Sequence, residues 1–323
     1  MNNFQRSMGV VLVTGLFSGN LIARETIVIG DQAWEGAHAI SNVLKVVIEE
    51  KLDATVRIVN SDQNIVFAGM DRGDGSMDVL PDLWIPNSKS LWDAYIAPGS
   101  KASVTVNDKP YIGNQGMYVP GYVQDKYGIK SVEQLADPEI AKLFDINGTG
   151  KARWWAGAPG WNVTKVEQVR AKSYGYDKTF KPLVISDEAF RSELELTLAV
   201  EEPVVFYYWE PEGLFKKYDF RKLDEPSYNE SCYKMVTPEE SSDWKEKSSV
   251  KCGYPPATVY VAYSKSLHKR APKVAQFLKQ VNFNIPTLNE WILHLNEKED
   301  PYEVAKKWVA VHPEIVKEWV KGI

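Results

Sequence analysis

A two-lobed α/β fold, with a mainly parallel sheet at the centre of each lobe, is predicted by three features of this sequence. Apolar segments of strand length alternate with segments whose apolar residues recur at helical spacing, which is typical of βαβ units. The chain has 323 residues, more than one hydrophobic core usually serves. The strand–helix alternation restarts after residue 116 and again after an irregular polar segment, residues 224–251, so we expect the second lobe as an insertion into the first.

The first series of elements begins with a short buried strand at 26–30 and a helix at 36–52, in which Ile40, Leu44 and Val47 recur at helical spacing. The elements that follow in this series are a strand at 54–59, the start of a helix at 64–70 and a strand at 77–80.

The second series opens with a helix at 132–144, where Ser131 and Gln134 stand at the positions of a capping box. The elements predicted after it are helices at 163–171 and 188–201, strands at 203–208 and 257–263, and helices at 272–282, 287–297 and 301–320. We therefore predict a first lobe from residues 24–115, a second lobe from 116–220 and a return to the first lobe over 221–323. Two crossings between lobes make a hinge, and the cleft between hinged lobes is a common ligand site.

Residues 1–23 have the pattern of a cleaved signal peptide. Arg6 precedes an apolar run from Met8 to Phe17, which is shorter than the roughly 20 residues of a membrane span but typical of an export signal. Cleavage after Ala23 would release a soluble protein into the periplasm. In that oxidising compartment Cys232 and Cys252 are expected to form a disulfide, with two free buried thiols as the alternative.

The charge pattern argues against nucleic-acid and membrane-surface binding, because the formal net charge is −5 and basic residues form no stripe or patch. Catalysis finds little support either. The four histidines show no metal-ligand spacing, and neither cysteine has the context of a nucleophile. We expect a monomeric binding protein that uses no cofactor and is not an enzyme.

Tryptophan carries the main functional signal. Four of the 11 tryptophans stand where an apolar run ends and a Pro- or Gly-bordered turn or a helix begins: Trp34, Trp84, Trp161 and Trp209. Segments of this kind reach into clefts, and several indole faces that converge on one point bind a cation that cannot donate hydrogen bonds. The alternative is that each ring fills the core, but the shared context of the four favours a cage.

An anion site is predicted beside one of these rings. Trp161 directly precedes a helix whose first free amides belong to Asn162 and Val163, and the N-terminus of a helix binds anions through such amides and its dipole. An indole next to this helix start suits a zwitterion. The alternative is that Asn162 simply caps the helix.

The loop Asp145–Lys151 begins like a calcium-binding loop but has Ala156 where a bidentate Glu is required. We therefore favour a turn built from Asn and Gly over a metal site.

The longest motifs resemble the substrate-binding proteins of ABC importers for glycine betaine, choline and related osmolytes. The resemblance covers most of the chain and is strongest in residues 132–151, in Pro159-Gly160-Trp161 and in residues 203–211. It implies a periplasmic binding protein of type II-like fold, whose lobes close on a methylated onium ligand inside an aromatic box, and a membrane ABC permease as partner.

Carried over by position, Trp84, Trp161 and Trp209 match the box, Trp34 matches an aromatic residue of choline-type members, and the residues that match the carboxylate-binding amides are Asn162 and Val163.

Two departures from the family pattern leave the ligand open. The neighbourhood of a His that assists the carboxylate holds Asn87 and Ser88, and the acidic position of choline-type members is Gly36, with Glu35 beside it. Glycine betaine, choline, carnitine, dimethylsulfoniopropionate and trimethylamine N-oxide all fit. A binder of another small solute, such as an amino acid or a polyamine, and an enzyme acting on methylated amines are the alternatives.

Overall fold

The computed structural model describes residues 24–238 and 240–323. The predicted signal peptide, residues 1–23, lies outside the described residues. Within the described ranges, none of the helices combines the length and the apolar character needed to cross a membrane.

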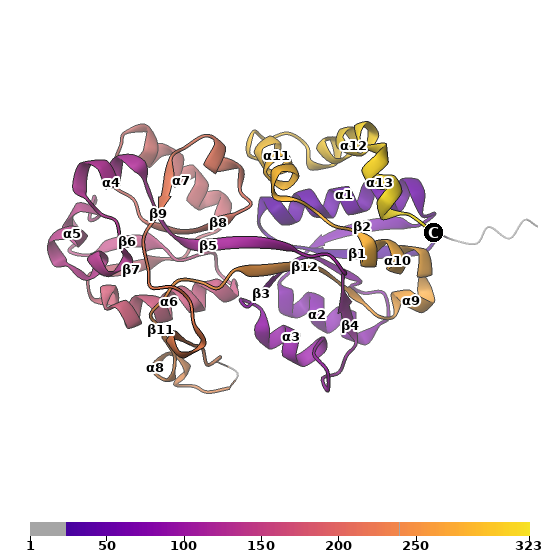
Figure 1. Cartoon of the computed structure of the whole chain (residues 1–323), viewed down its shortest axis with the longest axis horizontal. Helices are drawn as coiled ribbons and strands as arrows, with labels where there is room; N and C mark the ends of the chain where they lie inside the picture. The colour runs from indigo at the N-terminus through magenta and orange to yellow at the C-terminus, as the bar shows by residue number, and fades with distance from the viewer. Residues whose placement is uncertain (1–23, 239) are drawn as a thin grey trace, which may run out of the picture.

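Two lobes share one long curled sheet, which confirms the predicted two-lobed α/β fold (Figure 1). The strands lie side by side in the order β2 (Thr55–Asn60), β1 (Thr26–Asp31), β3 (Val79–Ile85), β12 (Ala257–Ser264), β5 (Tyr111–Pro120), β8 (Phe206–Glu210), β6 (Ala152–Trp155) and β7 (Phe180–Leu183). Two short strands pair outside this path, β4 (Val104–Val106) with β12 and β9 (Phe220–Lys222) with β5.

The pairing is parallel towards both ends of the sheet and antiparallel in its middle. β1 runs parallel to β2 and β3, and β6 runs parallel to β7 and β8. In the middle, β12 pairs antiparallel with β3 and β5, and β5 pairs antiparallel with β8. The sheet is therefore mixed, because the long strands β5 and β12 connect the two lobes (Figure 1).

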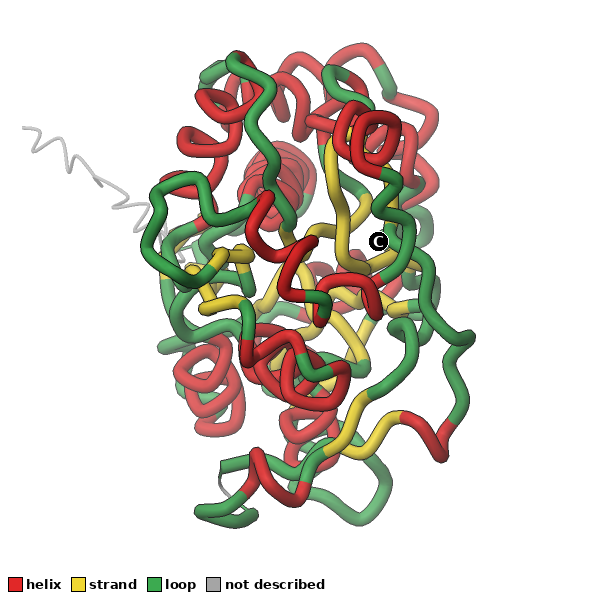
Figure 2. The backbone as a smooth tube through the Cα atoms, turned by 90° about the vertical axis from the view of Figure 1, so that its left-hand side faces the viewer, coloured by secondary structure: helices red, strands yellow, loops and turns green. Residues whose placement is uncertain are grey.

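Helices flank the sheet in both lobes, so that the strands lie inside the molecule (Figure 2). We call lobe 1 the part built on β1–β4 and β12. Its helices are α1 (Glu35–Lys51), α2 (Gln63–Arg72), α3 (Lys89–Tyr95), α9 (Leu267–Arg270), α10 (Pro272–Gln280), α11 (Ile285–Asn296), α12 (Pro301–Val311) and α13 (Pro313–Trp319). We call lobe 2 the part built on β6–β9, with helices α4 (Gly121–Tyr127), α5 (Pro138–Leu143), α6 (Asn162–Tyr174) and α7 (Asp187–Ala199).

Prolines divide two of the predicted helices. The segment predicted as one helix at 132–144 is a 3₁₀ turn, Val132–Ala136, followed by α5, because Pro138 starts the second helix and Asp137 caps it by accepting a hydrogen bond from the Glu139 amide. Pro313 likewise separates α12 from α13. The predicted capping box is present, with the Ser131 amide donating to Gln134 Oε1 at 3.0 Å.

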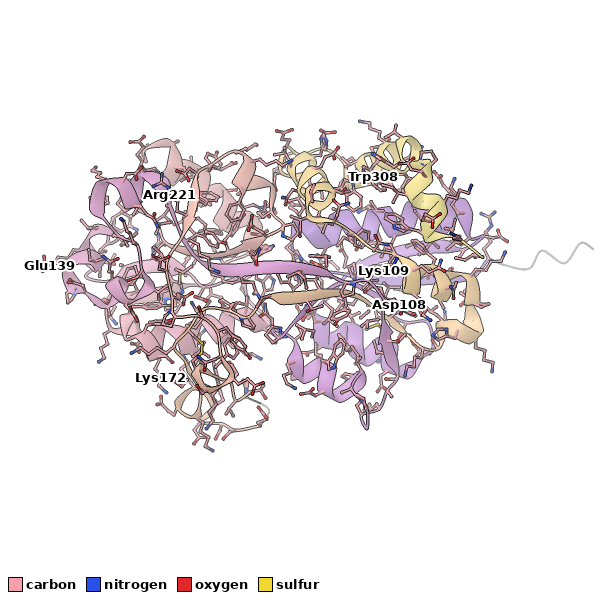
Figure 3. The ribbon with its side chains drawn as sticks, in the orientation of Figure 1. Asp108, Lys109, Glu139, Lys172, Arg221 and Trp308 are labelled. Atoms are coloured by element: carbon pink, nitrogen blue, oxygen red, sulfur yellow. A yellow bond between two sulfur atoms is a disulfide. The ribbon has the colours of Figure 1, made fainter. Side chains whose placement is uncertain are left out.

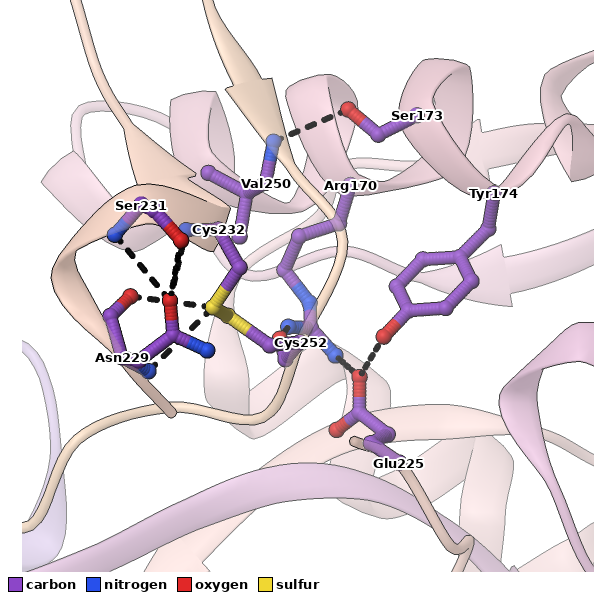
Figure 4. The surroundings of a disulfide bond; sticks show 9 residues. All are labelled: Arg170, Ser173, Tyr174, Glu225, Asn229, Ser231, Cys232, Val250 and Cys252. Atoms are coloured by element: carbon purple, nitrogen blue, oxygen red, sulfur yellow. Dashed lines mark hydrogen bonds and ion pairs between the residues drawn. A yellow bond between two sulfur atoms is a disulfide. The ribbon is translucent and has the colours of Figure 1, made fainter. Parts of the chain in front are cut away.

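The predicted disulfide between Cys232 and Cys252 is present. It closes a polar segment that contains the small elements β10 (Tyr233–Lys234), α8 (Trp244–Lys247) and β11 (Ser249–Val250) and packs on α6. Arg170 of α6, fully buried, donates to the Cys252 carbonyl oxygen at 2.6 Å and forms an ion pair with Glu225 (Figure 4). The stapled segment is therefore fixed to lobe 2.

Candidate functional site

A cavity of about 320 Å³ lies between the lobes. Lobe 1 and lobe 2 both contribute to its wall, and all four tryptophans singled out in the sequence line it. The lining residues are Gln32, Ala33, Trp34, Asn60, Ser61, Asp62, Gln63, Trp84, Asn87, Ser88, Ala158, Pro159, Gly160, Trp161, Asn162, Val163, Ser186, Tyr207 and Trp209. Among these described residues none is Lys, Arg or His.

Each of the four tryptophans stands at or near an end of its element. Trp34 is the N-cap residue of α1, and Trp161 is the N-cap residue of α6. Trp84 and Trp209 are the next-to-last residues of β3 and β8. The predicted ends of these two strands were wrong by a few residues, because both strands continue through the tryptophan to the residue before a proline.

Three of these indoles pack edge to face across the boundary between the lobes. The ring centroids of Trp34 and Trp161 are 5.3 Å apart, as are those of Trp161 and Trp209, and both pairs are T-shaped. Such arrangements are favourable for aromatic pairs. Trp161 is only partly buried, whereas Trp34, Trp84 and Trp209 are at most 9% exposed. The rings are therefore packed against one another and still line the cavity.

Asp82 of β3 joins Trp34 to Trp84 and was not foreseen from the sequence. Its Oδ2 accepts hydrogen bonds from Nε1 of Trp34 at 2.6 Å and from Nε1 of Trp84 at 3.0 Å, and its Oδ1 accepts from the Tyr111 hydroxyl at 2.6 Å. The signal that could have revealed it is an acidic residue inside the otherwise apolar strand Val79–Ile85. Burial raises the pKa of Asp82, and the hydrogen bonds from Tyr111, Trp34 and Trp84 act in the opposite direction.

One glycine, Gly113, makes room for this arrangement, and a second, Gly36, lies next to it. A Cβ on Gly113 would lie 2.5 Å from the Trp84 ring, so any other residue there would displace the indole. A Cβ on Gly36, the position that is acidic in choline-type members, would lie 3.7 Å from Asp82 Oδ2. A carboxylate from β3 therefore lies next to that position.

The N-terminus of α6 opens into the same cavity. The amides of Asn162 and Val163 precede the first i→i−4 hydrogen bond of the helix and have no acceptor within it. The first turn of α6 contains no acidic residue, so the positive end of the helix dipole is not neutralised from within the helix. This geometry favours an anionic group of a ligand next to Trp161.

Asn162 does not cap α6, so the alternative interpretation of this residue is wrong. It is the first residue of the helix, and its side chain points across the cleft, where Nδ2 lies 3.4 Å from Gln63 Oε1 and 3.3 Å from Ser88 Oγ. Ser88 in turn donates to Gln63 Oε1 at 2.7 Å. These contacts join the rims of the two lobes.

A second polar group lies near the cavity wall. Gln115 Oε1 accepts from Asn87 Nδ2 at 2.6 Å and from the Tyr207 hydroxyl at 2.7 Å. With the side-chain amides oriented in this way, the buried Asn87 Oδ1 and Gln115 Nε2 have no partner among the described residues. The polar part of the site is therefore built from amides and hydroxyls.

Arg191 of α7 connects lobe 2 to lobe 1 beside the cavity. Its guanidinium donates to Glu35 of α1 and to Asn296 of α11, and its Nε lies 3.6 Å from Asp187 Oδ2 on its own helix. Burial raises the pKa of Asp187 to about 7, although the positive charge of Arg191 lowers it. Glu35, which stands beside the acidic position of choline-type members, is thus one half of an ion pair between the lobes.

The loop Asp145–Lys151 lies outside this site and forms a turn, as predicted. Asp145 Oδ1 accepts from the Thr149 amide at 2.9 Å, and Asp145 Oδ2 accepts from the Gly150 amide at 2.7 Å. The carboxylate therefore closes the turn on itself.

Two hinged lobes around an aromatic cavity define a substrate-binding protein of the two-lobed type. The model of a family described as the substrate-binding domain of ABC-type glycine betaine transport systems matches residues 25–311, and the chain belongs to this family.

Two curated relatives match 84% and 98% of the chain at low identity. The glycine betaine/proline betaine-binding periplasmic protein of Salmonella typhimurium is 24% identical over 290 residues, which cover 84% of this chain and 82% of that protein. The glycine betaine-binding periplasmic protein OusX of Dickeya dadantii is 23% identical and covers 98% of this chain and 96% of its own length.

Solved structures share the fold. Lactococcal OpuAC in a closed complex with glycine betaine has a TM-score of 0.68 and 20% identity, covering 92% of this chain and all of its own. An ABC-transporter choline-binding protein in complex with choline has a TM-score of 0.71 and 18% identity, covering 92% of each chain.

Proposed function

We propose that this protein is the substrate-binding component of an ABC importer and captures a small methylated onium osmolyte between its lobes. The observation that carries the proposal is the convergence of Trp34, Trp84, Trp161 and Trp209 on one interlobe cavity. Glycine betaine, choline, carnitine, dimethylsulfoniopropionate and trimethylamine N-oxide are the candidate ligands. A methylated onium head cannot donate hydrogen bonds, so an indole face suits it better than a polar group does.

The energetic basis is cation–π attraction combined with exclusion of water. Each ring that faces a cation contributes roughly 0.5–2 kcal/mol, and more as the site becomes drier. Among the described lining residues of the cavity, Asp62 is the only carboxylate and none is Lys, Arg or His. A ligand with a positive group therefore meets no competing side-chain cation.

The other end of the ligand is assigned to α6. We propose that the amides of Asn162 and Val163 bind a carboxylate or another electron-rich oxygen, since this helix start has no acidic residue in its first turn. The neutral groups of Asn87, Ser88 and Tyr207 line the same cavity and would accommodate a hydroxyl equally well. Because these polar groups suit both a carboxylate and a hydroxyl, the proposal includes all five candidate ligands.

We propose that the protein acts in the periplasm, after residues 1–23 have directed its export and been removed, and that it delivers its ligand to a membrane ABC permease as a monomer. The names of the Salmonella and Dickeya relatives, both periplasmic binding proteins, support this location. Membership in a family of substrate-binding domains supports a role in binding and not in catalysis.

We also propose where the lobes divide. Residues 24–115 and 116–220 correspond to the first segment of lobe 1 and to lobe 2. Residues 221–323 form the return segment, which reaches lobe 1 at β12, because the Arg170 contact with Cys252 attaches the preceding stapled segment to α6.

Calorimetric titration of the mature protein with the five candidates tests the proposed function. We expect micromolar or tighter binding of at least one, and a loss of tens-fold or more in Trp209→Ala, because removing one wall also opens the cage to water. Absence of binding to all five by the well-folded wild type would refute the onium proposal. Equal affinity of Trp209→Ala and wild type would refute the cage.

A further inference from the structure

Asp82 is buried behind the cavity wall and holds two of its rings. The carboxylate is 1% exposed and does not line the cavity itself. One oxygen, Oδ2, accepts the indole N–H groups of both Trp34 and Trp84. Trp34 comes from the start of α1 and Trp84 from β3, so a single atom connects rings that belong to two different elements.

These hydrogen bonds determine how the rings are presented. An indole N–H can only donate, so both contacts require Oδ2 as acceptor, and hydrogen bonds to an ionised acceptor are stronger than neutral ones. A tryptophan side chain has two rotatable bonds. When packing holds the ring body and Asp82 holds its N–H edge, the face that is turned towards a ligand is fixed as well.

The same contacts change what the rings can attract. A carboxylate that accepts an indole N–H increases the electron density of that ring, and cation–π attraction depends on this density. The negative charge itself also acts on a cation in the cavity, because electrostatic interactions are stronger in a buried, poorly hydrated environment. Tyr111 supports the arrangement by donating its hydroxyl to Asp82 Oδ1 from β5.

We propose that Asp82 is a positioning residue of the cage, which orients Trp34 and Trp84 and makes the site select for the permanent positive charge of its ligand. The inference rests on the proposed function, since it assigns a selectivity to the same site. It concerns the preference for a charged onium head over an uncharged group of the same shape.

Carbon analogues of the ligands separate charge from shape. In tert-butylacetic acid a carbon replaces the nitrogen of glycine betaine, and the alcohol with a carbon in place of the nitrogen of choline is dimethylbutanol, (CH3)3C-CH2-CH2-OH. The experiment titrates glycine betaine, choline and both analogues into wild type and Asp82→Asn. Of glycine betaine and choline, the relevant compound is the one that wild type binds more tightly. We expect the affinity of Asp82→Asn for this compound to be lower than that of wild type by at least about tenfold. We expect the affinity for its carbon analogue to change by about twofold or less, because shape and burial are retained.

A purely structural role would weaken the onium compound and its analogue by the same factor, and that result would overturn the proposal. Asp31→Asn is the matched control, because Asp31 is also buried but bonds to His38 and Ser41 and not to an indole. Its ratio of onium to analogue affinity should equal that of wild type. If wild type binds none of the five candidate ligands, the proposed function itself is refuted. If wild type binds a ligand but Asp82→Asn shows no selective loss, only the role of Asp82 is refuted.

Indole N–H resonances give a second test that is independent of ligand. The protein has 11 tryptophans. In Asp82→Asn the indole N–H signals of Trp34 and Trp84 should shift, because these two groups lose an ionised acceptor. The signals of the other tryptophans should stay in place. If Asp82→Asn does not fold, Tyr111→Phe replaces it. Removal of the hydroxyl frees Asp82 Oδ1, so the same two signals should shift by a smaller amount. Unchanged signals in a folded variant would overturn the proposal.

Discussion

Two groups of tryptophans in this molecule have opposite roles. The cage rings Trp34, Trp84, Trp161 and Trp209 lie on segments from both lobes and line a cavity. The C-terminal group, Trp291, Trp308 and Trp319, lies on α11, α12 and α13 within lobe 1, where Figure 3 labels Trp308. Trp308 packs edge to face on Trp291 at 4.8 Å and stacks on Trp319 at 5.6 Å, and all three are at most 6% exposed.

This difference shows that the local sequence context of a tryptophan predicts its role, in the cage or in the core, better than its burial does. Trp291 and Trp308 occupy interior positions of amphipathic helices, and the helical period turns them towards the core. The cage rings stand at or near the ends of elements, where the chain turns and a side chain can face a cleft. Both groups are largely buried, so exposure alone would not distinguish them.

A pair of substitutions, Trp308→Ala and Trp161→Ala, tests most directly whether the two groups have different roles. Trp308→Ala should lower the free energy of unfolding by about 3–5 kcal/mol, because a large core side chain is lost, and should leave ligand affinity unchanged at a temperature where the variant is folded. Trp161→Ala should weaken ligand binding by tens-fold at a smaller cost in stability, since this ring is only partly buried. Denaturant unfolding and calorimetric titration of both variants measure the two effects, and a reversed pattern would contradict the division.

A smaller effect concerns Asp187, an acidic residue next to the cavity residue Ser186. The ring contacts described for Trp291, Trp308 and Trp319 involve no acidic side chain. The folded-state pKa of Asp187 is about 7, above its usual 3.8, because the carboxyl is buried. Between these values the folded protein holds a proton that the unfolded chain has released, so this group makes stability fall as pH rises through that window. Asp187→Asn should remove a slope on the order of 1 kcal/mol per pH unit between pH 5 and 7.

Denaturant unfolding of wild type and Asp187→Asn at several pH values measures that slope. The charges of Glu35, Glu212 and His38 also act on Asp187, so the difference between the two proteins is the relevant quantity. A constant difference from pH 5 to 7 would show that Asp187 has no raised pKa.

The smallest effect concerns the ion pair between the lobes. The cage needs both lobes, whereas the C-terminal group lies within lobe 1, so breaking this contact should affect the cage alone. Glu35→Gln removes the charge that Arg191 meets on lobe 1. The contact between the lobes should be weakened, and ligand affinity should fall by roughly threefold to tenfold, mainly through faster dissociation. Stopped-flow fluorescence and titration measure both changes.

Glu193→Gln is the matched control for this prediction. Glu193 lies on the same helix as Arg191 but pairs with Arg153 inside lobe 2, and both side chains are about 40% exposed. Its removal should change affinity by less than about twofold, because exposed ion pairs contribute little. An equal loss in both variants would show that the interlobe pair has no special role.

Much of the fold could be predicted because its signals are local. The alternation of elements, the capping box at Ser131, the disulfide and the four cavity tryptophans all depend on residues close together in the sequence or on residue type. The prolines at 138 and 313 were also visible, and their effect on the helices was underestimated.

The parts of the site that could not be predicted depend on long-range packing. Asp82 meets Trp34 across 48 positions and Tyr111 across 29, and Arg191 meets Glu35 across 156. No periodicity reports such pairings, because side chains from different elements are brought together only by the packed sheet and helices. The same reason explains why the contacts of Glu35 and Asn162 with the other lobe could not be predicted, and why capping of α6 by Asn162 remained an alternative.

The position of β12 in the sheet has a consequence for how the chain is made. This strand lies between β3 and β5, yet its residues, Ala257–Ser264, come more than 130 positions after β5 has ended. A ribosome that has released lobe 2 has still not released the strand that completes lobe 1, and the cavity needs both lobes. Native pairing of β12 with β3 and β5 is therefore postponed until about four-fifths of the polypeptide exists. If the chain is exported as proposed above, and passes unfolded through a membrane channel, such late completion is an advantage.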